Sequence, residues 1–168
     1  MRRLLKFLHT MGAIGLMGGF ACLIALIQIS PPPASLAGYA SIHAGMAEIA
    51  TWVVFPSVAV TLIAGLLAIA ANPIFHNAGW AWIKLATGVL MFEGTLAYGI
   101  GPIQVEAELS AKALAGQAAA SSVGGIDGSL ESGLWALLFV ATANVVLGVW
   151  RPRIIRPADA PAKAAVDA

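Results

Sequence analysis

The sequence predicts an all-α protein, a four-helix transmembrane bundle with both termini on the cytoplasmic side. Of its 168 residues, 60% are hydrophobic and only 10% are charged, whereas soluble domains carry about 25% charged residues. Charged residues are absent from 7–47, 49–83 and 132–150, and about 20 apolar residues suffice to cross a bilayer. This composition excludes a soluble enzyme and a disordered chain. A net charge of +1 gives no reason to expect nucleic-acid binding.

Prolines set the ends of the four predicted spans. A proline lacks the amide hydrogen and clashes with the preceding turn, so a proline after an apolar stretch indicates a helix stop. Pro56 instead lies inside the second span, which it should kink, and packed neighbours must then satisfy the freed carbonyl. The predicted spans and the prolines that follow them are 7–29 before Pro31, 42–71 before Pro73, 80–101 before Pro102, and 132–150 before Pro152.

Basic residues gather at the two ends of the chain, which predicts the orientation. Lysine and arginine favour the cytoplasmic side of a membrane, so both termini and the loop at 72–79 should be cytoplasmic. The first apolar stretch is longer than the roughly 7–15 residues of a signal-peptide core, so we expect it to remain as a span. Residues 1–156 form a single membrane domain, and the Ala-, Pro- and charge-rich residues 157–168 form a disordered cytoplasmic tail.

The acidic segment between the third and fourth spans is predicted to face outward. Residues 104–120 are rich in alanine and favour a short amphipathic helix lying on the membrane surface. Residues 121–129 contain three glycines and should form a flexible joint before the last span.

Two glutamates are predicted to lie within the bilayer, where ionisable side chains are costly and face the protein interior. Glu93 lies about 14 residues into the third span, roughly 20 Å from its cytoplasmic end. Glu48 enters the second span from the outside, and we expect the two at similar depth. One interpretation is a proton or cation site with a catalytic or coupling role for Glu93. The other is a protonated carboxyl bonded to a neighbour such as Thr51 or Tyr98.

His9 lies near the cytoplasmic end of the first span, on one helical face with Gly12 and Gly19. Such small residues let helices pack closely, or they leave room beside the histidine for a flat ligand. Histidine is a common axial ligand of haem through a neutral imidazole nitrogen. His43 opens the second span on the outer side, as a metal ligand, a cap or a headgroup contact. Because His9 and His43 lie near opposite membrane faces, they should not share one haem.

Lys84 lies four residues into the third span, on the side of the membrane where His9 lies. It can snorkel to the headgroups, or it can contact an anionic group such as a haem propionate. Lys84 and Glu93 are about 180° apart around a helix, so both cannot point at the bundle centre.

Two short motifs resemble known bacterial membrane families. The segment Lys6–His9, followed by Gly12 and Gly18–Gly19, resembles the first helix of several of them. Trp80 and Trp82 before Ile83–Leu85 are similar to the start of the third helix in the HemJ-type protoporphyrinogen oxidases. Those are four-span proteins that bind b-type haem, and a first-helix histidine and a third-helix lysine are thought essential in them.

The resemblance implies haem b as cofactor, with His9 and Gly12 and Gly19 at the binding site and Lys84 as a propionate or substrate contact. The chain is also similar to the copper-resistance D proteins and to uncharacterised four-span relatives, which implies a bacterial inner membrane. It departs from the oxidases in lacking a tryptophan before Gly18–Gly19 and in carrying Glu93 in the third span.

Three hypotheses follow for the function. The first is a b-type haem protein with a redox or oxidase-like role, and therefore haem or porphyrin as a partner. The second is proton- or cation-coupled transport through Glu48 and Glu93, which needs a homo-oligomer because four spans are few for a transporter. The third is an accessory subunit of a larger membrane complex. An absorption spectrum of the purified protein distinguishes the first from the others.

Overall fold

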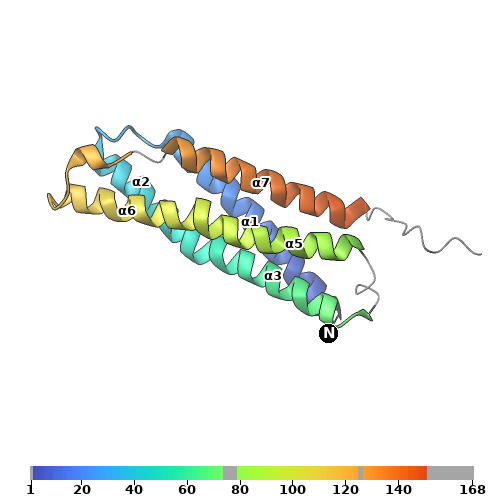
Figure 1. The fold of residues 1–168 in the computed structure, drawn as a ribbon. Helices are drawn as coiled ribbons and strands as arrows, with labels where there is room; N and C mark the ends of the chain where they lie inside the picture. Colours follow the sequence, from blue (N-terminus) through green and yellow to red (C-terminus); the bar gives the residue numbers. More distant parts are fainter. Residues whose placement is uncertain (1, 74–78, 125–126, 151–168) are drawn as a thin grey trace, which may run out of the picture.

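The computed structural model describes residues 2–73, 79–124 and 127–150, and these are helical with no strand among them (Figure 1). Two of the helices are long and carry a short π-helical segment in their middle. The helical elements in chain order are α1 (Arg2–Ile29), α2 (Leu36–Ile49), the π segment η1 (Ala50–Val54), α3 (Phe55–Ala70), α5 (Gly79–Gly94), the π segment η2 (Thr95–Ile100), α6 (Gly101–Leu114), the 3₁₀ turn η3 (Ala120–Ser122) and α7 (Asp127–Trp150).

Four continuous helices are long and apolar enough to cross a membrane: Arg3–Ile29, Leu36–Ala70, Gly79–Leu114 and Gly128–Trp150. The four predicted spans are therefore confirmed as helices of membrane-spanning length. The second comprises α2, η1 and α3, and the third comprises α5, η2 and α6. At 35 and 36 residues, each measures roughly 50 Å, more than the ~30 Å hydrocarbon core of a bilayer.

The helices form a ring in which α1 and α5 each pack between α3 and α7. The outer parts of the two long helices, α2 and α6, pack on each other and run past the ends of α1 and α7 (Figure 1). We call the end where α1 begins and α3 ends the His9 end. The opposite end, formed by α2, α6 and the loops beside them, is the Glu106 end.

The apolar core fills the middle of the bundle and extends toward the Glu106 end. Phe20 and Leu134 are completely buried, and Val54 on η1 packs in the same cluster. The burial of many such side chains, at about 1.5–3 kcal/mol each in water, does not drive association within lipid, so close packing must hold the spans together. The core comprises Leu16, Phe20, Leu23, Ile24, Met46, Ala50, Val54, Val58, Met91, Ile100, Ile103, Leu130, Leu134, Leu137 and Ala141.

Each π segment lies directly before a proline in the first turn of the next helix, Pro56 in α3 and Pro102 in α6. A proline cannot donate to the carbonyl four residues earlier, and the wider π turn accommodates the mismatch. The predicted distortion at Pro56 therefore takes the form of η1. The predicted stop at Gly101–Pro102 is wrong, because the helix passes through η2 and continues to Leu114.

The segment 104–120 is consequently no separate surface helix. Its first part is the end of the third long helix, and it packs lengthwise against α2. The second helix begins at Leu36, earlier than the predicted 42, and the fourth begins at Asp127 where 132 was predicted. The first, second and fourth helices end within a residue of the predicted positions. The predicted tail 157–168 and most of the loop 72–79 lie outside the described residues.

Candidate functional site

The imidazole of His9 is held by the backbone of α3. Its Nδ1 lies 2.8 Å from the carbonyl oxygen of Thr61. A carbonyl only accepts hydrogen bonds, so Nδ1 carries the proton and the lone pair is on Nε2. The half-buried ring rests against Gly65, where a Cβ atom would lie 3.4 Å from Nδ1 and Cε1. A backbone carbonyl that fixes the tautomer in this way is the usual support of a ligating histidine.

Lys84 extends from α5 toward the neighbouring helix α7. A Cβ atom added at Gly148 would lie 2.7 Å from the Lys84 Nζ, and the side chain is half-buried. The two residues carried over from the resemblance therefore lie at the same end of the bundle, His9 against α3 and Lys84 against α7.

Each helix of the bundle contributes a polar side chain to the His9 end. Besides His9 on α1 and Lys84 on α5, the hydroxyl of Thr61 on α3 donates to a backbone carbonyl at 2.7 Å. Thr87 on α5 donates to Asn144 Oδ1 on α7 at 2.6 Å. Large buried apolar side chains are scarce at this end of the described chain, since the core lies mostly on the other side of Met91 and Ala141. The His9 end therefore combines half-buried polar side chains from all four long helices with few large buried apolar ones.

Gly12 and Gly19 serve helix packing. A Cβ at Gly12 would overlap the Thr61 hydroxyl and lie 2.9 Å from the Ser57 carbonyl oxygen, and a Cβ at Gly19 would lie 2.7 Å from Val54 Cγ2. Helix α3 occupies the space that these glycines leave open, which is the close approach that small residues permit. The space in which a flat ligand was predicted on this face is thus filled by α3.

An apolar groove lies between α3 and α5 at the same end. Its volume is about 520 Å³, and it is lined by Leu66, Ile69, Ala70, Trp82 and Leu85. Ile69 follows Gly65 by one helical turn on the same face of α3, so the groove begins within a turn of the residue that the His9 ring contacts. The nearest room for the apolar part of a ligand is thus beside α3 and not on the glycine face.

Glu93 and Glu48 are both exposed, which contradicts the prediction that Glu93 faces the bundle interior. Met91 and Thr95 take the interior positions on this part of the helix, at 5% and 0% exposure, and Glu93 lies between them on the other side of the helix. The two carboxyls are also not level. Gln104 meets Thr51 at 3.4 Å, and counting along both helices from that contact separates the glutamates by roughly 20 Å.

The buried carboxyl of the described chain is Glu106, which the sequence did not indicate as a site. Glu106 is 1% exposed, and its Oε1 accepts from the Tyr39 hydroxyl at 3.0 Å and from the Gly124 amide at 2.6 Å. Gly124 has φ +90° and packs against Pro33, so only glycine suits that position. Glu106 thereby joins α2, α6 and both loops of the Glu106 end.

His43 belongs to this same cluster and not to the His9 end. Its ring stacks on Tyr39, with centroids 3.9 Å apart and planes at 24°. The Nδ1–H donates to the Tyr39 carbonyl oxygen at 3.0 Å, and the side chain is 1% exposed. The residues that the structure describes contain no group of three His, Cys, Asp or Glu that could hold a metal ion, so His9 and His43 do not form a joint metal site.

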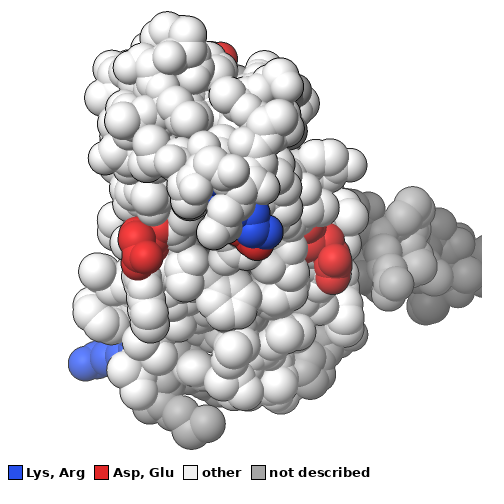
Figure 2. Space-filling model, turned by 90° about the vertical axis from the view of Figure 1, so that its left-hand side faces the viewer, with Lys and Arg blue, Asp and Glu red and all other residues white. Residues whose placement is uncertain are grey.

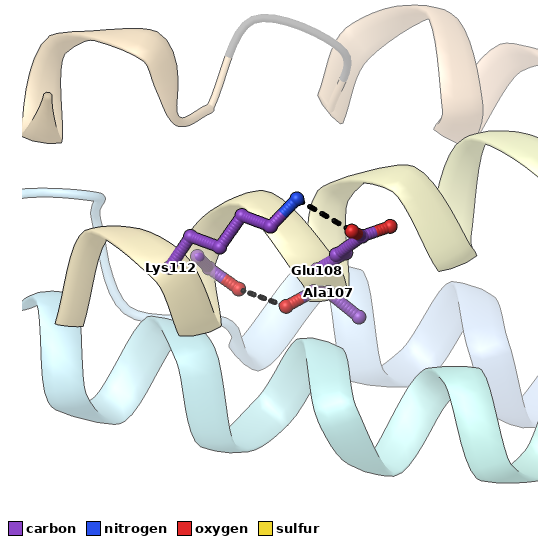
Figure 3. Close-up of polar contacts among 4 residues, drawn as sticks. Ala107, Glu108 and Lys112 are labelled. Atoms are coloured by element: carbon purple, nitrogen blue, oxygen red, sulfur yellow. Dashed lines mark hydrogen bonds and ion pairs between the residues drawn. The ribbon is translucent and has the colours of Figure 1, made fainter. Parts of the chain in front are cut away.

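Helical spacing carried a signal for the Glu106 cluster. Tyr39, His43 and Met46 share one face of α2, and Ile103, Glu106 and Ser110 share one face of α6. The other side of α6 is solvated, with Lys112 bound to Glu108 at 2.6 Å, while Ser110 donates to the Ala107 carbonyl at 3.0 Å (Figure 3). Viewed from this end, the surface is mostly uncharged, with separate small acidic and basic patches (Figure 2).

No family model, curated protein or solved structure matches this chain.

Proposed function

We propose that this chain is an integral membrane protein that binds b-type haem at its His9 end and has a redox or oxidase-like role. Nε2 of His9 would hold the haem iron, and Lys84 would supply the positive charge for a propionate or an anionic substrate. This follows the resemblance to the HemJ-type oxidases, and with it come a bacterial inner membrane and cytoplasmic termini. Haem, when bound, supplies one-electron chemistry whose potential its ligands and burial tune.

The tautomer of His9 is the observation that carries the proposal. Its Nδ1–H is committed to the Thr61 carbonyl at 2.8 Å, so the lone pair needed by an iron atom is on Nε2. Lys84 lies at the same end of the bundle, with its Nζ beside Gly148 on α7, and would provide the cation. The residues present therefore fit haem in both ligand and charge.

The chain's own residues would divide the work among themselves. By accepting the hydrogen bond from Nδ1–H, the Thr61 carbonyl keeps the His9 ring oriented and leaves the lone pair on Nε2. The half-buried Lys84 stem lies among apolar side chains while its ammonium meets an acidic group. The apolar groove lined by Leu66 and Trp82 offers the nearest non-polar surface. Glu93 has no part in this site, because its side chain is exposed.

The exposure of Glu93 and Glu48 also counts against coupled transport within one chain. A proton or cation path needs its carboxyl groups toward the interior or toward a water-filled cavity. At the height of Glu93, the interior of the bundle is filled by Met91 and Thr95.

An absorption spectrum tests the proposal. Protein purified from haem-replete cells should show a Soret band and about one haem per chain by pyridine haemochrome assay. His9→Ala should abolish the band, while His76→Ala, the matched control, should keep it. Lys84→Met, which preserves the apolar stem, should weaken haem retention and shift the midpoint potential. A colourless wild-type preparation, or a full Soret band in His9→Ala, would refute the assignment.

A further inference from the structure

Glu93 is an exposed carboxyl near the middle of the third membrane span. It lies 14 residues after Gly79 and 21 before Leu114, the two ends of the long helix, so roughly 20–30 Å of helix separates it from either end. The exposed side chains beside it are apolar, with Leu90 at 68% and Val89 at 43% exposure. In a bilayer, this face of α5 therefore turns one carboxyl toward the acyl chains.

A carboxyl at this depth is too far from water to be solvated by its own side chain. Snorkelling serves long lysine and arginine side chains near helix ends, and a glutamate near the middle lacks that reach. Ionisable residues within membranes face protein or a water-filled cavity. We therefore expect the surface of another protein to cover Glu93 in the membrane.

The same face is shaped for a close helix contact. Ala86, Leu90 and Glu93 on α5 and Ala97 on η2 follow one another at helical spacing, and all four are exposed. Alanines on either side of a larger residue let a second helix approach closely. We call these four residues the Glu93 face.

A second copy of this chain does not complement the Glu93 face in charge. Between Lys6 and Lys112 the sequence has one basic residue, Lys84. Lys84 lies about 13 Å along the helix from the level of Glu93, and it is turned toward Gly148. A copy set alongside in the same orientation therefore brings no cation to the Glu93 level.

We propose that the Glu93 face of α5 docks a transmembrane helix of a different protein, one that carries an arginine or lysine at the depth of Glu93. A charge pair shielded from water at such an interface sets partner and register, because either charge alone would be left unpaired in lipid. This inference is independent of haem binding, since the Glu93 face is exposed, whereas the His9 ring packs against Thr61 and Gly65 on α3. It names the residues through which this chain would act as an accessory subunit of a larger membrane complex.

Site-specific photocrosslinking in native membranes tests the proposal on the full chain. A crosslinking amino acid at Leu90 should give one adduct, whose partner carries a basic residue within a membrane span. The same amino acid at Ile14, 60% exposed on α1 across the ring from α5, is the matched control and should not give that adduct. Glu93→Gln should lower the Leu90 adduct at least about tenfold. Glu93→Lys combined with the partner's basic residue changed to Glu should restore it.

Unchanged melting of Glu93→Gln in detergent shows that the loss of adduct is not misfolding. Three outcomes overturn the proposal. They are an adduct of the mass of two copies of this chain, an equal yield in Glu93→Gln, and no adduct at Leu90 above the Ile14 level, which would leave lipid as the occupant.

Discussion

Replacing Glu106 by alanine should release the loop that closes the Glu106 end. Glu106 is 1% exposed and accepts hydrogen bonds from Tyr39 and from the Gly124 amide. Its removal leaves both donors buried without this acceptor, at about 1–3 kcal/mol each. We therefore expect a loss of about 2–6 kcal/mol, mainly in the local stability of the segment 115–124.

The magnitude lies near the lower end of that range if water enters and bonds to the freed donors. Even a loss of 2 kcal/mol raises the population of the locally open segment, and with it the rate of amide exchange, by about 30-fold. Glu106→Gln retains the oxygen Oε1 that accepts both bonds but removes the carboxylate charge, so its effect should fall between those of the wild type and Glu106→Ala.

Hydrogen exchange of the protein in nanodiscs measures this opening. The amides of 118–124 should exchange at least about 30-fold faster in Glu106→Ala, with α1 and α7 unchanged. Glu108→Ala is the matched control, because Glu108 lies two residues away on the exposed side of α6 and is paired only with Lys112. Equal exchange in the wild type and Glu106→Ala, or equal acceleration by Glu108→Ala, would show that Glu106 does not hold the loop.

Two further substitutions test the packing of the membrane bundle. Gly12→Ala should destabilise the protein by about 1–3 kcal/mol through overpacking, because its Cβ would overlap the Thr61 hydroxyl on α3. Gly18→Ala is the control and should leave thermal unfolding in detergent unchanged, because nothing lies within 4 Å of a Cβ at that position. Equal melting temperatures of the two variants would contradict the packing role of Gly12. Asn144→Leu removes the acceptor of Thr87 but should cost less than about 1.5 kcal/mol, since that hydroxyl also meets the Ile83 carbonyl at 3.0 Å. A larger fall in an SDS-unfolding titration would show that Asn144 does more than join α5 to α7.

The positions of the spans could be predicted from the sequence because the bilayer constrains length and polarity so strongly. The ends at Ile29, Ala70 and Trp150 follow from the loss of apolar residues or from prolines. The continuation through Pro102 could not be predicted in the same way. A proline in the first turn of a helix is tolerated, and whether a π segment precedes it depends on the packing of η2 against η1.

The candidate site was only partly predictable. His9 and Lys84 were indicated by their residue types and by the resemblance, and the structure places both at one end of the bundle. Glu93 was expected inside because buried charge is costly, but helical phase decides orientation, and Met91 and Thr95 hold the interior positions. Glu106 lies in the segment 104–120, which was predicted as a surface helix facing outward, and its burial depends on α2 and α6 extending together beyond the other helices (Figure 1).

The paired wide turns η1 and η2 also act on helical register. Each adds about one residue beyond α-helical winding, which rotates everything that follows by about 100° relative to an uninterrupted helix. Tyr39 and Glu106 lie on the far side of these turns from the membrane halves α3 and α5. Shortening either turn by one residue would therefore rotate one member of the Tyr39–Glu106 pair away from the other, and it would also leave Pro56 or Pro102 without the wide turn that accommodates it.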